Sequence, residues 1–414
     1  MKYFIALIVS LGFSAPVWAE QKVPQSQMEI QLSFVPLVKQ AAPAVVNIYA
    51  TRVTEARGNS FLDDPFFQRF FEGAAPEPRA QNSLGSGVIL SPNGIVVSNY
   101  HVVGMATDIR VVLNNRREYS ARVLLGDEAS DLAILQLEDA SDLPSLALRT
   151  SDDVQVGELT LAIGNPFGVG QTVSSGIISG LARSGGSDGN GTGYFIQTDA
   201  PINPGNSGGA LVDMAGRLIG INTSILTRSG GSNGIGFAIP SVLVAEFVNQ
   251  AKAGSDRFHR AWAGVSGQVL DYDMAASFGL DRSGGVIITD LHPASPFRTV
   301  GFEVGDVITA VDGQPVISGG EMLFRMSVGG IGNTAVVTRT RNGEASDVTV
   351  ELISAPDYPP RDFTVLGDDA ILAGLELALA NPAVSEELRL SPNIVGVVVV
   401  NTGPIAVQVG LRRG

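Results

Sequence analysis

Cysteine is absent from this chain of 414 residues, and histidine occurs only at positions 101, 259 and 292. Without cysteine the protein can form no disulfide, no iron–sulfur cluster, no zinc–cysteine site and no thiol nucleophile. A reaction that needs an imidazole must therefore use His101, His259 or His292. The sequence predicts no cofactor and no metal site.

Basic residues are scarce, with 27 Lys and Arg against 41 Asp and Glu, for a formal net charge of −14. Such a chain has little with which to neutralise phosphates, so we expect no nucleic-acid partner. Charged residues make up only 16% of the sequence, whereas 44% are hydrophobic and 49 residues are glycine. This composition favours a β-rich fold with many tight turns, and the length favours two to three domains.

Long apolar runs are missing except at the N-terminus. There Lys2 precedes the mostly apolar stretch from Tyr3 to Phe13, and Val17-Trp18-Ala19 comes just before Glu20. This pattern predicts that residues 1–19 are an export signal. The alternative is an uncleaved anchor, because the stretch is almost long enough to span a bilayer. We expect no stable membrane span once the signal is removed.

Short apolar runs recur from residue 84 to residue 250, separated by Gly, Asn, Asp or Pro, and a first strand is expected at 44–49. This spacing is typical of an antiparallel all-β sandwich or barrel. A helix over 242–251 would close the domain, which we place at residues 20–257. The residues that follow this helix, up to His259, indicate a polar hinge.

A second pattern, over residues 258–355, predicts a small module with a helix at 321–327 and a final strand at 336–341. Residues 363–414 repeat its theme, which indicates two copies of one module. GVVVVN at 396–401 corresponds to GVIITD at 285–290, and VGLRRG at 409–414 to VGFEVG at 300–305. Since the first copy continues for an apolar strand and a helix beyond this point, we expect the second copy to be incomplete.

The string GNSGG at 205–209 is the strongest chemical signal. A serine nucleophile needs a nearby base, and it needs backbone N–H groups aimed at the developing oxyanion. Gly205 and Gly208 would let the backbone approach a substrate carbonyl without a Cβ in the way. We expect the N–H groups of Gly205 and Ser207 to form the oxyanion hole, although the string alone is also compatible with a simple turn.

Two upstream residues complete a catalytic set. His101 ends an apolar run in VVSNYHVV, and Asp131 precedes another in SDLAIL. A carboxylate at the start of a strand can hold an imidazole in the required tautomer. The order His, Asp, Ser on an all-β domain is that of chymotrypsin. Separately these could be a core histidine and a turn residue; together with Ser207 they predict a catalytic triad.

The motifs SNYHVV, SDLAILQL, GNPFG, FIQTDAPINPGNSGGAL and GIGFAIP, in this order, resemble the HtrA (Deg/Do-like) family of exported, ATP-independent serine proteases. The resemblance implies a mostly β fold, with a chymotrypsin-like double β-barrel followed by two PDZ-like α+β modules, the second truncated. It implies a periplasmic enzyme that degrades misfolded or unfolded envelope proteins and binds peptide C-termini.

The resemblance also gives meanings to two loops. The aromatic segment FLDDPFFQRFF at 61–71 resembles a loop that reaches into a neighbouring subunit, so we expect a homo-oligomer built from trimers; a core cluster within the loop is the alternative. The glycine-rich stretch at 184–193 corresponds to a mobile sensor loop. It lacks the Lys-Ser/Thr ending of a phosphate loop.

Cleavage after small or aliphatic residues is expected from the position six residues before Ser207. A pocket for Lys or Arg would carry a carboxylate there, but this chain has Pro201. Asp199 is expected to order the loop instead. The apolar strand at 218–225 favours a shallow pocket for Val, Ala, Ile or Leu. The residues expected to bind substrate are Asn206, Ile221, Asn222, Thr223 and Ile225.

In the first module the resemblance places a carboxylate-binding loop at Trp262-Ala263-Gly264-Val265, where Ala263 replaces a commoner leucine. A peptide would add there as an extended strand, although a purely structural β module is the alternative. Two other functions stay open at this stage. One is a holdase chaperone or scaffold, and the other is a membrane-anchored regulatory protease that cuts one partner.

Overall fold

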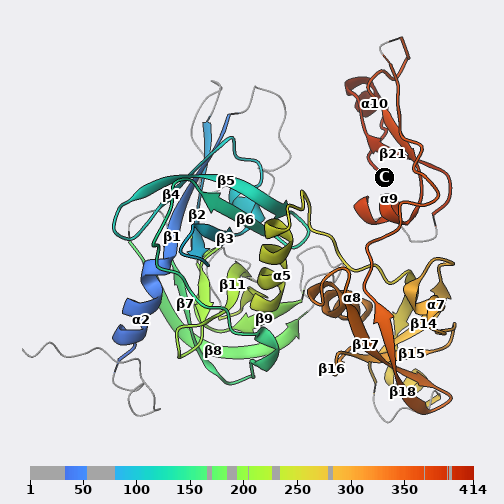
Figure 1. The fold of residues 1–414 in the computed structure, drawn as a ribbon, viewed down its shortest axis with the longest axis horizontal. Coiled ribbons are helices and arrows are strands. Elements are labelled where there is room, and N and C mark those ends of the chain that lie inside the picture. Colours follow the sequence, from blue (N-terminus) through green and yellow to red (C-terminus); the bar gives the residue numbers. More distant parts are fainter. Residues whose placement is uncertain are drawn as a thin grey trace, which may run out of the picture.

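The computed structural model describes residues 33–53, 80–165, 170–183, 194–203, 205–225, 234–277, 283–367, 369–388, 390 and 394–414 (Figure 1). The expected signal at 1–19, the aromatic segment at 61–71 and the glycine-rich stretch at 184–193 lie outside the described residues. The fold is mostly β, as the sequence predicts, with two closed barrels followed by smaller sheets.

The first barrel closes in the order β1-β2-β3-β6-β5-β4 with antiparallel pairing throughout. Two short helical segments, α2 (Val35–Ala41) and η1 (Ala42–Ala44), precede it, and the one-turn helix α4 (Tyr100–Val103) follows β3. Its strands are β1 (Val45–Val53), β2 (Ala80–Ile89), β3 (Ile95–Ser98), β4 (Asp108–Val112), β5 (Glu118–Asp127) and β6 (Leu132–Leu137).

The second barrel closes in the order β10-β11-β12-β9-β8-β7. A short 3-10 helix, η3 (Ser151–Asp153), lies between the barrels in the chain. Its strands are β7 (Leu159–Gly164), β8 (Thr172–Arg183), β9 (Phe195–Thr198), β10 (Ala210–Val212), β11 (Leu218–Ile225) and β12 (Gly236–Pro240). Both barrels thus arise from the apolar runs that predict an all-β domain.

Strand β5 is an element that the apolar runs do not predict. Of its ten residues only Leu125 is fully buried, and Glu118, Ser120, Arg122 and Val123 are exposed. Its apolar run, Val123 to Leu125, is only three residues long. The strand is held by its backbone pairing to β4 and β6, and Tyr119, Ala121 and Leu124 pack partly against the core.

Helix α5 (Ser241–Lys252) closes the barrels, in agreement with the helix expected at 242–251. It buries Leu243, Val244 and Phe247 against them. The Phe247 ring stacks on Phe258 with centroids 3.9 Å apart and planes 13° apart. Because Phe258 lies in the hinge, this stacked pair joins the barrels to the segment that leads into the next module.

The next module is a sheet in the order β13-β14-β15-β17-β18, with β16 paired to β15. Strand β18 pairs with β17 along its whole length, so the strand expected at 336–341 is not the last one. Residues 344–351 are mostly polar and exposed, and for that reason give no apolar signal. The elements are β13 (Val265–Val269), β14 (Val286–Leu291), β15 (Val307–Val311), β16 (Gln314–Pro315), β17 (Thr334–Arg341), β18 (Glu344–Glu351), α6 (Tyr272–Ser277), α7 (Pro296–Thr299) and α8 (Gly319–Val328).

The C-terminal segment forms a three-stranded sheet, β19 (Thr364–Val365), β20 (Glu376–Leu379) and β21 (Val397–Asn401), with helices α9 (Pro382–Glu387) and α10 (Pro404–Gln408). Here β21 is followed by the Pro-initiated helix α10, as β14 is followed by the Pro-initiated helix α7. That residues 363–414 are a second copy of the module stays a prediction. In the described part of the chain no helix is long and apolar enough to span a membrane.

We predict that Phe247→Ala lowers the free energy of unfolding of the barrels by about 3–5 kcal/mol, the usual cost of emptying a buried aromatic site. Phe247 is 0% exposed and loses both its barrel contacts and its stack on Phe258. Urea titration followed by far-UV circular dichroism measures the change. Lys252→Ala, at an exposed position of the same helix, is the matched control and should change stability by less than about 0.5 kcal/mol. Equal losses in both variants would contradict the prediction.

Candidate active site

His101 lies in the one-turn helix α4, directly after β3. The next two residues, Val102 and Val103, are buried in the barrel core and anchor the turn. Gly85 on β2 makes room for this packing, because a Cβ at that position would meet a Val102 methyl at 2.6 Å. The imidazole is therefore carried by a short helix that is anchored to the barrel core by its two valines.

Asp131 lies in the turn between β5 and β6, with a φ of 51°. Aspartate tolerates this left-handed conformation better than most side chains. Its N–H donates to the Glu128 carbonyl at 3.2 Å, and its own carbonyl accepts from the Asn99 amide at 2.9 Å. The turn is thus bound on both sides, which fixes the direction of the Asp131 carboxylate.

The His101 and Asp131 side chains contact each other directly. Nδ1 of His101 lies 2.9 Å from both carboxylate oxygens, and the backbone N–H of His101 donates to Oδ1 at 3.0 Å. Burial alone would raise the pKa of Asp131, but attraction to His101, together with hydrogen bonds from His101 and Thr223, brings that pKa below its usual value. Asp131 therefore stays ionised at neutral pH and orients the imidazole.

Ser207 comes from the second barrel, in the loop that precedes β10. Its hydroxyl donates to the Thr223 carbonyl at 3.0 Å, and the Thr223 hydroxyl donates to Oδ2 of Asp131 at 2.6 Å. Thr223 on β11 consequently links the serine of one barrel to the carboxylate of the other. The structure brings the three predicted residues together at the junction of the barrels.

The loop around Ser207 is held at several backbone atoms. Gly205 and Gly208 have φ values of 92° and 81°, a region that favours glycine. A Cβ on Gly208 would meet the Ser86 carbonyl oxygen at 2.1 Å, so glycine is required there. Gly208 also donates its N–H to the Asn222 carbonyl at 2.8 Å. Ser86 is not among the predicted site residues. Its position between two glycines is the feature of the sequence that points to a close backbone approach there.

Several side chains expected to bind substrate have partners within the protein. Asn206 accepts a hydrogen bond from the Thr172 hydroxyl at 2.7 Å, and Asn222 donates to the Ala210 carbonyl at 3.0 Å. Ile221 is 0% exposed in the barrel core. The side chains of Asn206, Asn222 and Ile221 thus have partners inside the protein, and their contact with a substrate stays a prediction. Ile225 is the last residue of β11.

Asp199 has the loop-ordering position expected from the sequence. Its Oδ1 accepts the N–H of Ile177 on β8 at 2.7 Å, which joins the end of β9 to its neighbour. Pro201, six residues before Ser207, is exposed.

The loop before β13 is closed by three hydrogen bonds. Trp262 donates its N–H to the Ile353 carbonyl at 2.8 Å, the Ser295 hydroxyl donates to the Ala263 carbonyl at 2.6 Å, and the His292 N–H donates to the Gly264 carbonyl at 2.9 Å. The side chain of Ala263 is buried in the module core. The loop is therefore a fixed backbone feature at the start of the strand.

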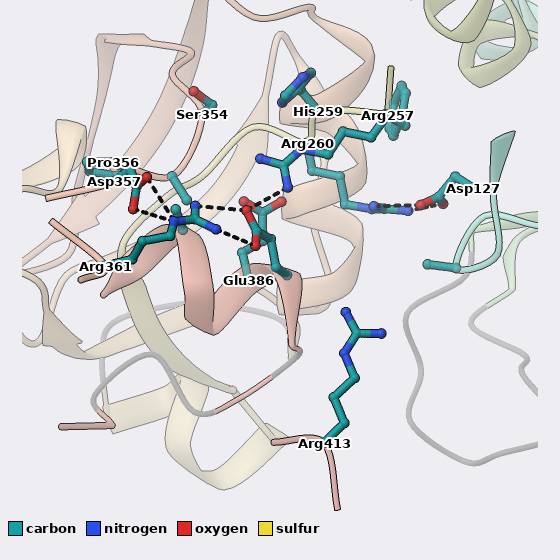
Figure 2. A pocket seen from close by; sticks show the side chains of 15 residues that line it. Asp127, Arg257, His259, Arg260, Ser354, Pro356, Asp357, Arg361, Glu386 and Arg413 are labelled. Atoms are coloured by element: carbon teal, nitrogen blue, oxygen red, sulfur yellow. Dashed lines mark hydrogen bonds and ion pairs between the residues drawn. The ribbon is translucent and has the colours of Figure 1, made fainter. Parts of the chain in front are cut away.

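A polar pocket of about 570 Å³, shown in Figure 2, lies between the hinge that ends at His259 and a second connecting segment, residues 354–362, which we call the second hinge. Arg260, directly after the first hinge, reaches the Asp127 carboxylate at the end of β5 and donates to the Ser130 hydroxyl at 2.8 Å. On the other side, Arg361 of the second hinge pairs with Glu387 of α9 at 2.9 Å. The turn that carries Asp131 is thus bonded to the segment that leads into the next module.

Comparison with known proteins identifies the two-barrel domain and the module that follows it. Residues 85–221 match the trypsin-like peptidase domain family, and residues 264–352 match the PDZ domain family. A solved structure described as the HtrA-type protease AlgW with a decapeptide is 41% identical, with a TM-score of 0.57, covering 79% of this chain and 100% of that one. AlgW with a tripeptide is 39% identical with a TM-score of 0.58, covering 80% and 99%.

Curated relatives agree. A Haemophilus influenzae protein named "Probable periplasmic serine protease do/HhoA-like" is 37% identical over 445 residues, covering 98% of this chain and 95% of that protein. The "Periplasmic pH-dependent serine endoprotease DegQ" of Escherichia coli is 39% identical over 354 residues, covering 84% and 76%. With its two-barrel trypsin-like domain followed by a PDZ domain, the chain belongs to the HtrA (DegP/DegQ) family of serine endoproteases.

Proposed function

We propose that Ser207 is the nucleophile, His101 the general base and Asp131 the group that orients His101. The observation that carries this assignment is the chain of contacts from the His101 imidazole to Asp131, from Asp131 to the Thr223 hydroxyl, and from the Thr223 carbonyl to the Ser207 hydroxyl. It unites a base, an ionised carboxylate and a half-buried serine at one junction.

Hydrolysis then proceeds in two halves. The Ser207 hydroxyl, which donates to the Thr223 carbonyl in this structure, first turns toward His101. It gives its proton to His101 as its oxygen bonds to the substrate carbonyl carbon, and His101 passes that proton to the departing amine. Water next attacks the acyl-enzyme with His101 again as base, which releases the acid and restores the serine. The negatively charged oxygen of each tetrahedral intermediate would be bound by the N–H groups of Gly205 and Ser207. No nucleotide takes part in either half.

The proposed substrates are misfolded or unfolded polypeptides of the bacterial envelope, cut after small or aliphatic residues. Such residues are buried in folded proteins, so a preference for them selects unfolded chains. A periplasmic location is supported by the signal-like residues 1–19 and by the relatives named periplasmic. The expectation of trimers rests on the aromatic segment at 61–71 and stays a prediction.

The PDZ module is proposed to bind peptide C-termini by strand addition beside β13. The fixed loop at Trp262–Val265 supports this, because its backbone lies where an added strand would end. The small Ala263 leaves the preferred last residue of the peptide open.

We predict that Ser207→Ala abolishes cleavage of casein, with a loss of about 10⁶ in kcat, while the fold is retained. Removal of the hydroxyl leaves no nucleophile at the junction of the barrels. Ser120→Ala, at an exposed position on β5, is the control and should keep full activity. If Ser207→Ala cleaved casein at a tenth of the normal rate, the assignment would be wrong. A wild-type protein that only prevents aggregation would favour the chaperone alternative.

A second prediction concerns the bond between Thr223 and Asp131. Thr223→Val should lower kcat/KM about ten- to a hundredfold, because a hydrogen bond to a charged group contributes about 1.5–3 kcal/mol. Thr223→Ser keeps the hydroxyl and should stay close to wild type. Steady-state kinetics on a peptide substrate distinguishes the roles: a higher KM at unchanged kcat would show that Thr223 contacts substrate instead.

The cleaved bonds provide a third prediction. Fragments of a denatured protein should end mostly in Val, Ala, Ile or Leu, because Pro201 stands where a carboxylate would be needed and Asp199 is bound to Ile177. Mass spectrometry of the digest identifies the C-terminal residues, with a parallel incubation of Ser207→Ala to remove contaminating cleavage. A majority of Lys or Arg ends would overturn the expected specificity.

A further inference from the structure

Ser86 lies on β2 of the first barrel, yet it is bonded to the second. It is 0% exposed and stands between Gly85 and Gly87. Strand β2 pairs with β3 only at Val88 and Ile89, so the backbone of Ser86 on that side is available to other partners. Its N–H donates to the carbonyl of Ser207 at 2.9 Å, across the junction of the barrels.

The hydroxyl of Ser86 makes two further bonds into the second barrel. It donates to the Gly205 carbonyl at 2.6 Å and accepts from the N–H of Asn165 at 2.8 Å. Asn165 directly follows β7, and Gly205 begins the nucleophile loop. The Ser86 carbonyl in turn accepts from the Ser98 hydroxyl at 2.8 Å. One buried hydroxyl thus joins the end of β7 to the nucleophile loop.

These bonds fix the direction of the peptide groups around Ser207. A peptide unit is planar, so anchoring the Gly205 carbonyl also sets the N–H of Asn206, which donates to the Asn203 carbonyl at 2.9 Å. The Ser207 carbonyl is anchored by the Ser86 N–H. The peptide between these two carbonyls, which carries the Ser207 N–H, is held at the Asn206 carbonyl by the N–H of Gly209 at 2.9 Å, so the Ser207 N–H has little freedom to turn. Without the hydroxyl, the Gly205 carbonyl and the Asn165 N–H would lose this hydrogen-bond partner. Because unsatisfied buried polar groups are costly, the loop would then favour a conformation in which they find other partners.

We propose that Ser86 is a positioning residue that aims the oxyanion-binding N–H group of Ser207 from the opposite barrel. The proposal rests on the proposed function, because it takes Ser207 as the nucleophile. Ser86 itself does not contact the substrate. It acts on the transition state through the loop, so its removal should lower kcat while ground-state binding of the substrate changes little.

The test compares Ser86→Ala with the wild-type protein on a peptide substrate and with a peptide boronic acid. The boronic acid gains a bond from Ser207 Oγ to boron, with the serine proton passed to His101, and so reproduces the tetrahedral intermediate. We expect kcat to fall about 10- to 100-fold, KM to stay near its original value, and the inhibition constant of the boronic acid to rise by the same factor as kcat falls. The loss is smaller than the 10²–10³ typical for deleting an oxyanion donor, because the donor is displaced but not removed.

Thr160→Val is the matched control. Thr160 is 1% exposed and donates its hydroxyl to the Val212 carbonyl at 2.7 Å, so the variant also removes a buried hydroxyl bonded to a carbonyl within the barrels. It should lower the melting temperature without lowering kcat. A kcat loss in Thr160→Val equal to that in Ser86→Ala would assign the effect to stability and overturn the proposal.

Ser86→Cys is the second variant in case Ser86→Ala does not fold, because it nearly keeps the shape and offers only a weak S–H donor. Wild-type kcat in either folded variant would contradict the proposal. Ser207→Ala is assayed in parallel. If it retains activity, the proposed function fails; if it is inactive while Ser86→Ala or Ser86→Cys is fully active, only the role of Ser86 fails.

Discussion

The Asp131 carboxylate accepts hydrogen bonds from both barrels, from His101 in the first and from Thr223 in the second. A buried carboxylate is costly unless it is paired and bonded, so these partners keep it ionised and fix its position. The left-handed turn at Asp131, the Asn99 amide and the short helix α4 all serve this one arrangement. The bond from Thr223 makes this carboxylate one of the links between the two barrels.

How much of the fold the sequence predicts depends on whether an element buries a run of apolar side chains. Strands that are buried over a continuous run, such as β6 and β11, can be predicted because buried positions are mostly filled by apolar residues. Strands β5 and β18 cannot, since β5 has one fully buried residue and β18 is mostly exposed, so that backbone pairing contributes much of what holds them. The residues of the proposed triad lie in recognisable motifs, but their mutual contacts depend on how two barrels pack.

The same limit applies to the residues expected to bind substrate and to Ser86, whose contacts the motifs do not predict. Motif position alone could not tell that Ile221 packs into the core or that Asn222 is bonded to β10. Nor could it tell that a serine on β2 would meet a loop more than a hundred positions later in the sequence. Contacts of this kind are decided by three-dimensional packing, and a glycine on either side of Ser86 is the only local trace they leave in the sequence.

The separation of the proposed base and nucleophile onto two barrels has a consequence for the life of the chain. All strands of the first barrel precede the β10–β11 region in the chain, so a protein in which only the first barrel has folded has an imidazole and a carboxylate but no completed site. Cleavage can begin only after the second barrel has closed and delivered Ser207 to the junction. If the two barrels separate while each stays folded, Ser207 moves away from His101 and Asp131, and the proposed site is lost. The division of the proposed site between two barrels thus makes its assembly depend on their docking.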